Sequence, residues 1–156
     1  MLGSRLPTEF RESDMNKNLN FLLLLMLSAI TLAASGCSAP QPAGLSEEQV
    51  SAVAENILQA INANDHEKFA QDFSDKMKAA FPQAQFSQLR DLLQSASGDF
   101  VSLGLPGLTN SQGYAIYRFP CQFERETVSM TITFLIGGQK VEGIWFDSDN
   151  LRNNAQ

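Results

Sequence analysis

The pattern of hydrophobic and polar positions changes character at Cys37. Before it, an apolar run extends from Phe21 to Ala34 without a charged residue, and small residues follow the run. A helix that crosses a membrane needs about 18 to 20 apolar residues, and this run is shorter. With Lys17 ahead of it, the run is typical of an export signal that is cleaved.

After Cys37, the apolar residues first recur at the spacing of helices. The clearest helix is predicted over Leu45–Asn62, where Ser46 and Gln49 form a capping box at its start. Apolar residues then share one face at i, i+3, i+4 and i+7: Val50, Val53, Ala54, Ile57, Leu58 and Ile61. We expect this helix to bury that face against a core.

Two further helices are predicted before Gly98. The first has Asp65 as its cap and breaks near Ser74, which is itself a good cap; it ends at Pro82, because proline cannot continue a helix. The second is expected to be capped by Ser87 and to end at Gly98, since glycine readily adopts the left-handed conformation of a helix C-terminus.

Beyond Gly98 the period falls from near four to two, which predicts antiparallel strands. The strands are expected over 100–103, 114–126, 127–136 and 139–146, with a two-residue turn at Gly137-Gly138 between the last two. Alternate positions form the buried face: Ala115, Tyr117, Phe119, Cys121, Phe123, Val128, Met130, Ile132, Phe134 and Ile136.

Two residues within these strands modify the expected sheet. Pro120 lacks an N–H and predicts an edge position or a bulge, and Gly143 predicts a bend that lets the sheet curl. The elements together indicate an α+β fold, in which three N-terminal helices pack on a curved antiparallel sheet of about four strands.

Four stretches of the chain resemble a known family. They are SEEQVSAVAENILQAINAND, HEKFAQDFSDKMKAAF, SGDF and YRFPCQFERETVSMTITFLIGGQKVEGIWF, and the resemblance covers Leu45–Asp147. The family is an uncharacterised domain of microbial lipoproteins, also found beside some α/β-hydrolase domains, in the cone-shaped nuclear-transport-factor-two-like (cystatin-like) superfamily. The resemblance implies a cone whose open end holds a small apolar ligand. Some superfamily members are isomerases or dehydratases that use an Asp with a His or Tyr.

The residues Ala34-Ser35-Gly36-Cys37 resemble the lipobox of bacterial and archaeal lipoproteins, whose cysteine is lipidated and becomes the new N-terminus. Ala34 stands where that motif usually has leucine. The resemblance implies attachment to the extracytoplasmic face of the cell membrane through at least two acyl chains on Cys37, because one chain binds only marginally. An uncleaved anchor and an ordinary secreted protein are the alternatives.

These signals divide the chain into four parts. Residues 1–36 form the leader, in which synthesis is expected to begin at Met15, and residues 37–44 form the lipidated cysteine and a proline-containing tether. Residues 45–150 form a single α+β domain, and residues 151–156 form a polar tail.

The charges and the cysteines limit the partners. The chain has 11 basic and 17 acidic residues and a formal net charge of −6, and the charges of the leader cancel. A domain without a basic surface is not expected to bind nucleic acid. If lipid occupies Cys37, then Cys121 has no partner for a disulfide, and its place in an alternating strand favours a buried core residue over a nucleophile.

No motif predicts a cofactor or a metal. His66 is the only histidine and follows a helix cap, where it is interpreted as solvated, and there is neither a glycine-rich phosphate loop nor a cluster of metal ligands. Aromatic and polar residues are candidates for lining a pocket: Tyr114, Tyr117, Arg118, Glu124, Trp145 and Asp147. The alternative is that Tyr117 and Trp145 are core residues. In that case Arg118 and Glu124 lie on a solvated strand face.

Two classes of function follow. The first is a non-catalytic binding module that offers its cone to a small apolar ligand. Its polar sheet face would serve a homodimer: Thr127, Ser129, Thr131 and Thr133. The second is a small enzyme of the isomerase or hydratase kind, which requires an ionisable residue with a shifted pKa in a water-poor pocket. Since no catalytic pair is identified, catalysis is the less favoured class.

Overall fold

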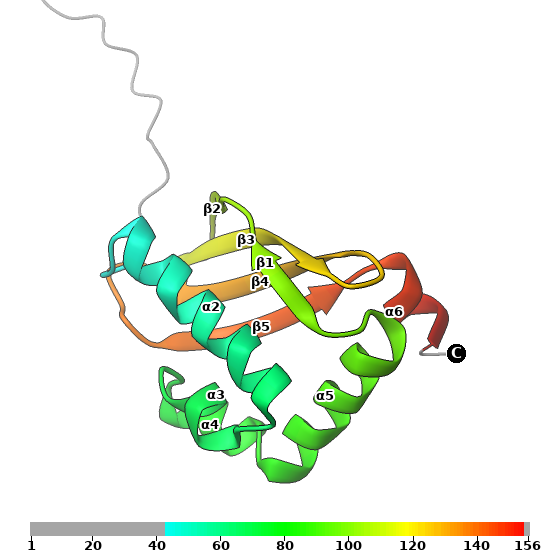
Figure 1. Ribbon diagram of the computed structural model, residues 1–156. Helices are drawn as coiled ribbons and strands as arrows, with labels where there is room; N and C mark the ends of the chain where they lie inside the picture. The colour runs from blue at the N-terminus through cyan, green and yellow to red at the C-terminus, as the bar shows by residue number, and fades with distance from the viewer. Residues whose placement is uncertain (1–42, 155–156) are drawn as a thin grey trace, which may run out of the picture. The chain divides into compact units, whose positions relative to one another are not determined.

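The computed structural model describes residues 43–154. These residues form an α+β arrangement of five helices and an open antiparallel sheet of five strands. Four of the helices precede the strands along the chain and one follows them. Figure 1 shows the longest helix running along one face of the sheet, with shorter helices beside it. The predicted leader, Cys37 and most of the tether lie outside the described residues.

The first described helix, α2 (Glu47–Ala63), begins and ends as its sequence dictates. The predicted capping box is present, with Ser46 Oγ accepting from Gln49 N–H at 3.2 Å and Gln49 Oε1 accepting from Ser46 N–H at 2.9 Å. The helix ends at Asn64, which adopts the left-handed conformation. Its buried face confirms the predicted apolar stripe, although Val53 is only half-buried.

The chain then forms two short helices, α3 (His66–Ala70) and α4 (Asp75–Ala80). The predicted break near Ser74 is confirmed, because Ser74 caps α4 by accepting a hydrogen bond from Met77 N–H. Phe73 lies in the segment between the two helices, and its ring packs against that of Phe69 of α3, with 4.9 Å between ring centroids.

The next helix, α5 (Gln83–Ala96), begins earlier than predicted. We expected Ser87 to cap it, but Ser87 lies inside the helix and Pro82 occupies the cap position without a side-chain hydrogen bond. The carbonyl of Pro82 accepts from Phe86 N–H, and Phe86 is fully buried, so core packing fixes the first turn. The predicted end at Gly98 is confirmed by its φ of +83°.

The sheet is built around two long strands. They are β3 (Tyr114–Phe123) and β4 (Thr127–Leu135), and β5 (Val141–Asp147) pairs with the far side of β4. Two shorter strands, β1 (Phe100–Leu103) and β2 (Gly107–Ser111), share the other side of β3. The buried faces of β3 and β4 confirm the predicted alternation from Ala115 to Phe134.

The strand β2 was not predicted. It holds a single large apolar residue, Leu108, and therefore carries too weak an alternation to identify. The turn that joins it to β3 is Gln112-Gly113, with φ values of 50° and 84°. A two-residue turn with positive φ at both positions matches the twist of a hairpin, so the turn supplies what the strand sequence lacks.

Pro120 does not lie at an edge of the sheet. It belongs to the central strand β3, with Ser129 of β4 opposite it. On its other side, the carbonyl of Pro120 accepts from Gly104 N–H at 2.8 Å, beyond the end of β1 and before β2 begins. The N–H that proline lacks would therefore point toward the gap between β1 and β2, where no strand is present to accept it. A Cβ on Gly104 would lie 2.6 Å from Pro120 Cγ, so the close approach requires glycine.

The link between β4 and β5 is longer than the predicted two-residue turn. β4 ends at Leu135, so Ile136 leaves the core face and is exposed, contrary to the prediction. The register between the two strands shifts at Thr133, which is paired with Gly143. This irregularity agrees with the bend that Gly143 predicted.

The last described residues form α6 (Asp149–Asn154) in place of the predicted polar tail. Leu151 is buried in the core, which gives the helix its anchor. The interior is rich in fully buried phenylalanine: Phe69, Phe86, Phe119 and Phe134 at 0% exposure, and Phe73 and Phe123 at 1%. Side chains thus fill the space between helices and sheet.

Candidate functional site

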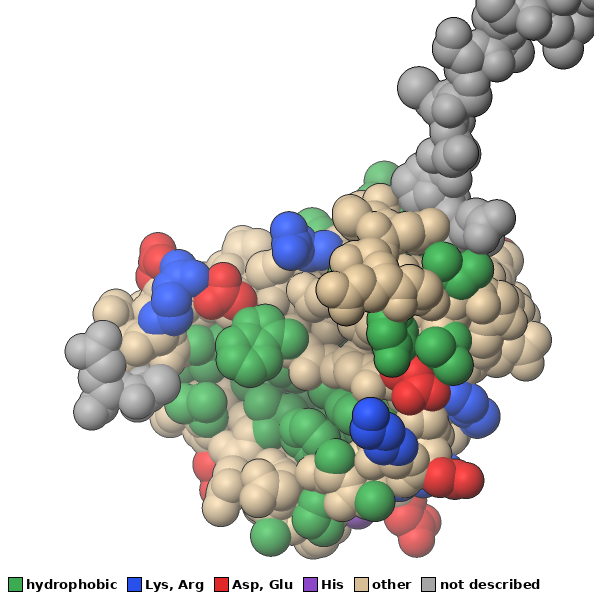
Figure 2. Space-filling view, turned by 180° about the vertical axis from the view of Figure 1, so that it is seen from behind, with side chains coloured by type: hydrophobic (Ala, Val, Ile, Leu, Met, Phe, Trp, Pro, Cys, Tyr) green, Lys and Arg blue, Asp and Glu red, His purple; other side chains and the backbone are tan. Residues whose placement is uncertain are grey.

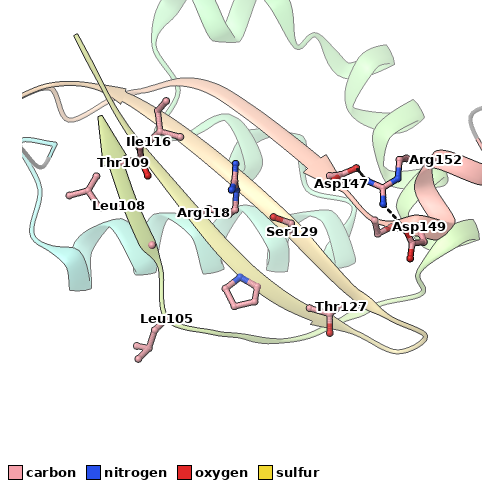
Figure 3. Close-up of a pocket in the computed structure, with 13 residues that line it drawn as sticks. Leu105, Leu108, Thr109, Ile116, Arg118, Thr127, Ser129, Asp147, Asp149 and Arg152 are labelled. Atoms are coloured by element: carbon pink, nitrogen blue, oxygen red, sulfur yellow. Dashed lines mark hydrogen bonds and ion pairs between the residues drawn. The ribbon is translucent and has the colours of Figure 1, made fainter. Parts of the chain in front are cut away.

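The outer face of the sheet, opposite the core, carries a shallow depression of about 760 Å³. Arg118 lies near its middle, in register with Gly107 of β2 and Thr131 of β4. Figure 3 shows Arg118 on the open face, between β2 on one side and α6 on the other. Within the part of the chain described by the structure, Arg118 is exposed and has no ion-pair partner.

One end of this depression is a cluster of three charged residues. Arg152 contacts both oxygens of Asp147, at 2.7 and 2.8 Å, and one oxygen of Asp149 at 2.5 Å (Figure 3). The hydrogen bond that Arg152 donates to Asp149 and the charge of Asp147 raise the pKa of Arg152. Through these ion pairs Arg152 of α6 is joined to Asp147 at the end of β5.

A second hollow has the opposite chemistry. It is a groove of about 410 Å³ between the edge strand β5 and the helix α5. Figure 2 shows hydrophobic side chains gathered around a hollow on this side of the domain. The groove is lined mainly by apolar residues: Phe81, Leu89, Leu92, Leu93, Ile144, Trp145, Phe146, Leu151 and Arg152. The one ionisable member, Arg152, is half exposed and already paired.

The groove has a buried floor and an accessible rim. Leu93 and Leu151 are buried, whereas Leu89 and Leu92 are only half-buried. Trp145 stands at the rim with 68% of its surface exposed, so its interpretation as a core residue is wrong. A large aromatic side chain left in water beside an apolar hollow marks a surface suited to binding.

The six predicted pocket residues do not form one site. Trp145 lines the groove, while Arg118 and Asp147 line the outer depression. Tyr117 is buried, and its hydroxyl accepts from Ala43 N–H at 3.2 Å. Neither of these two hollows includes Tyr114, Tyr117 or Glu124 in its lining. Sequence reasoning missed the helical wall of the groove, because its leucines read as an ordinary core face.

Glu124 has a local structural role instead. It lies in the turn between β3 and β4, where its carboxylate accepts from Asp99 N–H at 3.3 Å. No ion pair joins Arg118 and Glu124 within residues 43–154. Both side chains are exposed, as the interpretation of a solvated face predicted, but Glu124 lies in the turn after β3 and not in the strand expected over 114–126.

The described residues also bear on metal binding, membrane crossing and thiol chemistry. Among residues 43–154, no group of three or more His, Cys, Asp or Glu side chains is placed to hold a metal ion. In the same range, no helix is both long and apolar enough to cross a bilayer.

Cys121 is fully buried, and burial raises the pKa of its thiol to about 12, which confirms a core residue rather than a nucleophile.

Comparison with known families gives one match, over residues 54–142, to a family described as a protein of unknown function, DUF3887. The chain belongs to this family. The match of this DUF3887 domain begins inside α2 and ends at the start of β5. It therefore includes the α5 wall of the groove and stops before Trp145. A comparison with curated proteins finds no match.

Proposed function

We propose that this DUF3887 protein is a lipid-tethered binding module whose ligand site is the apolar groove between β5 and α5. The observation that carries the proposal is the composition of the groove, which is apolar apart from Arg152 and has Trp145 at its rim. Its volume of about 410 Å³ lies within the range of small-molecule sites, roughly 300–1,000 Å³. A small apolar ligand is the class that such a lining favours.

The fold supports the same proposal at a finer level. Helices on one side of a curved antiparallel sheet are the arrangement expected for the nuclear-transport-factor-two-like cone, to which we assign this domain. The assignment rests on the sequence resemblance together with the groove at one margin of the helix and sheet layers. In this arrangement phenylalanine fills the centre, and the space left for a ligand lies at the open side next to β5.

The alternative of an isomerase or hydratase needs an ionisable group inside a water-poor pocket. Within the described residues, buried Ser97 and Ser148 are not ionisable at neutral pH, and buried Tyr117 and Cys121 line neither of the two hollows. The groove offers Arg152, which is half exposed and paired with Asp147 and Asp149. These observations favour binding over catalysis as the role of the groove.

The ligand site is tested with N-phenyl-1-naphthylamine, an uncharged dye that fluoresces in apolar surroundings. Because Trp145 is the only tryptophan of the chain, its emission reports directly on the groove. We expect saturable dye binding that quenches Trp145. Leu92→Lys should weaken the binding at least about tenfold, because it places a charge in the apolar lining.

The matched control is Leu105→Lys, which makes the same chemical change at a residue that is 86% exposed and outside the groove. It should leave dye binding unchanged. Circular dichroism establishes that both variants are folded. Equal binding by the two lysine variants would place the dye elsewhere and remove the groove as the ligand site.

The tether is a separate part of the proposal. The motif that ends at Cys37 supports lipidation and attachment to the extracytoplasmic face of the membrane. Cys37→Ser should move the protein from the membrane fraction to the soluble extracytoplasmic fraction, as measured by fractionation and mass spectrometry of the N-terminus. Persistent membrane binding of the variant, with the leader still attached, would show a spanning anchor instead of lipid.

The polar sheet face remains a proposed surface for a second copy. Thr127 and Ser129 lie in the lining of the outer depression, beside Arg118. Thr131 and Thr133 are half-buried on the same face. Pairing through this face is one of the outcomes that the cross-linking experiment below distinguishes.

A further inference from the structure

The backbone groups of Phe100 in β1 and of Val141 at the start of β5 already form hydrogen bonds with other parts of the chain. At the β1 margin, the side chain of Asn62 donates to Phe100 O at 2.9 Å and accepts from Phe100 N–H at 3.0 Å, so an amide occupies the edge as a neighbouring strand would. At the start of β5, Val141 bonds to Asp72 O and Ser74 N–H. Both contacts block the approach of another strand.

The rest of β5 is not blocked. The carbonyl of Pro120 points toward β1, so Pro120 and Ser129 form a non-hydrogen-bonded pair. The N–H and C=O groups of Ser129 therefore point away from β3 and toward β5. Residues alternate along a strand, and Ser129 and Thr131 therefore form the hydrogen-bonded pairs with β5. The N–H and C=O groups of Ile144 and Phe146 consequently face outward. No described residue beyond the sheet bonds to them.

This open stretch also lacks the usual protection of an edge. Between Gly143 and Phe146 there is no proline and no charged residue, and three of the four are strong strand formers. Trp145 lies at its centre with 68% exposure. A strand edge with free backbone groups and an exposed aromatic side chain is a template for pairing with a further strand.

We propose that β5 pairs antiparallel with β5 of a second copy of this chain, around a twofold axis at Trp145. In this register Ile144 lies opposite Phe146 of the second copy, and each Trp145 lies opposite its counterpart. The outward-facing N–H and C=O groups of Ile144 and Phe146 then bond to those of Phe146 and Ile144 of the second copy, as hydrogen-bonded pairs. The strand is thus complementary to itself, which is what a twofold interface requires.

The charges at the ends of β5 are compatible with this register. Gly143 lies opposite Asp147 of the second copy, and Glu142 lies opposite Ser148, so no two carboxylates face each other directly. Each carboxylate also has a partner within its own copy. Glu142 accepts a hydrogen bond from Ser74 Oγ at 3.1 Å, and Asp147 forms an ion pair with Arg152. Because the twofold pairing uses the β5 edge of both copies, assembly through this edge closes at two copies.

The dimer is expected to be weak in solution. Pairing over so few residues buries less than the roughly 1,200 Å² of a stable interface. Attachment of both copies to one membrane would raise their effective concentration and favour the pair. The proposal goes beyond ligand binding and requires no ligand.

Disulfide trapping tests the register. In a non-hydrogen-bonded antiparallel pair the Cα atoms lie about 4.5 Å apart, within the range of about 4.4–6.8 Å that a disulfide spans. The test uses residues 38–156, which keep the whole described core from Ala43 to Leu151. Trp145→Cys should form a covalent dimer under mild oxidation. Cys121, the other cysteine of this shortened chain, is buried and does not interfere.

Two control variants separate the alternatives. Leu105→Cys, at an exposed apolar residue of the outer depression, reports cross-linking away from the β5 edge, and Trp145→Cys should cross-link at least about tenfold faster. Thr133→Cys, on the polar sheet face, reports face-to-face pairing. If Trp145→Cys cross-links no faster than Leu105→Cys, or if Thr133→Cys is the fastest of the three, the edge proposal is wrong.

Sedimentation equilibrium of the unchanged 38–156 chain provides a measurement without any substitution. The mean mass should rise toward that of a dimer as the concentration approaches about 1 mM, and Trp145→Lys should hold it at the monomer by placing two like charges at the axis. A monomeric mass throughout would overturn the proposal. Because no dye is present, this result is independent of ligand binding in the groove.

Discussion

Replacing Phe69 by alanine is expected to destabilise the domain by about 3–5 kcal/mol, the range for removing a fully buried phenylalanine. Phe69 has 0% exposure and lies at the centre of an aromatic cluster beneath α3. Its ring centroid is 4.9 Å from that of Phe73, 5.7 Å from that of Phe81 and 4.8 Å from that of Phe86. Removing the Phe69 ring would leave a cavity, and the rings of Phe73, Phe81 and Phe86 would have to move to fill it.

Urea denaturation followed by circular dichroism measures this loss, and Leu105→Ala is the control. Leu105 is apolar but 86% exposed, so its truncation should change the free energy of unfolding by no more than about 0.5 kcal/mol. Phe81 also lines the groove, so Phe69→Ala should weaken dye binding in the fraction that remains folded. A loss no greater than that of the control would show that the cluster is not part of the cooperative core.

The sequence was sufficient where burial is one-sided and regular. In α2 the apolar spacing and the capping box between Ser46 and Gln49 each predict the same helix start. In β3 and β4 strict alternation predicted which residues face the core, from Ala115 to Phe134. These elements have one face covered and the other in water, so the period of the pattern carries most of the information.

It was insufficient where a neighbouring element decides the outcome. The start of α5 depends on the burial of Phe86, and the strand β2 depends on the hairpin turn at Gln112-Gly113. The effect of Pro120 depends on where the neighbouring strand is interrupted. Each of these features is set by contacts between residues distant in sequence, which no local period encodes.

The candidate site was only partly predictable for the same reason. Leu89, Leu92 and Leu93 occupy one helical stripe, yet only Leu93 is buried by the core, and the other two remain accessible in the groove. A periodic pattern shows which side of a helix is apolar and not how far the sheet covers it. Trp145 is exposed because its pairing with Thr131 places it on the outer face.

Glu126 connects the sheet to the helices that frame the groove. Its Oε1 accepts from Ser97 Oγ at 2.5 Å, at the end of α5, and from Ser148 Oγ at 2.8 Å, at the start of α6. Both serines are buried, at 0% and 7% exposure. Ser148 in turn accepts from Leu151 N–H at 3.2 Å, so the carboxylate fixes the helix that carries the Leu151 wall of the groove.

Glu126→Ala is therefore expected to lower the free energy of unfolding by about 2–3 kcal/mol, because two buried hydroxyls lose the charged acceptor they share. Glu126→Gln retains an acceptor oxygen and should lose less. Both variants should also weaken dye binding, since α6 and Leu151 are no longer held against β5. Urea denaturation and dye titration measure the two effects in the same samples.

Glu124→Ala is the matched control, because Glu124 is the same residue type in the same turn but is exposed and accepts one longer bond, from Asp99 N–H at 3.3 Å. Its loss should cost no more than about 0.5–1 kcal/mol and leave dye binding unchanged. If Glu126→Ala proves no more harmful than this control, the buried serines are satisfied without the carboxylate. The position of α6 would then depend on Leu151 packing, on the ion pairs of Arg152 and on the hydrogen bond from Asn150 to Ala96 O.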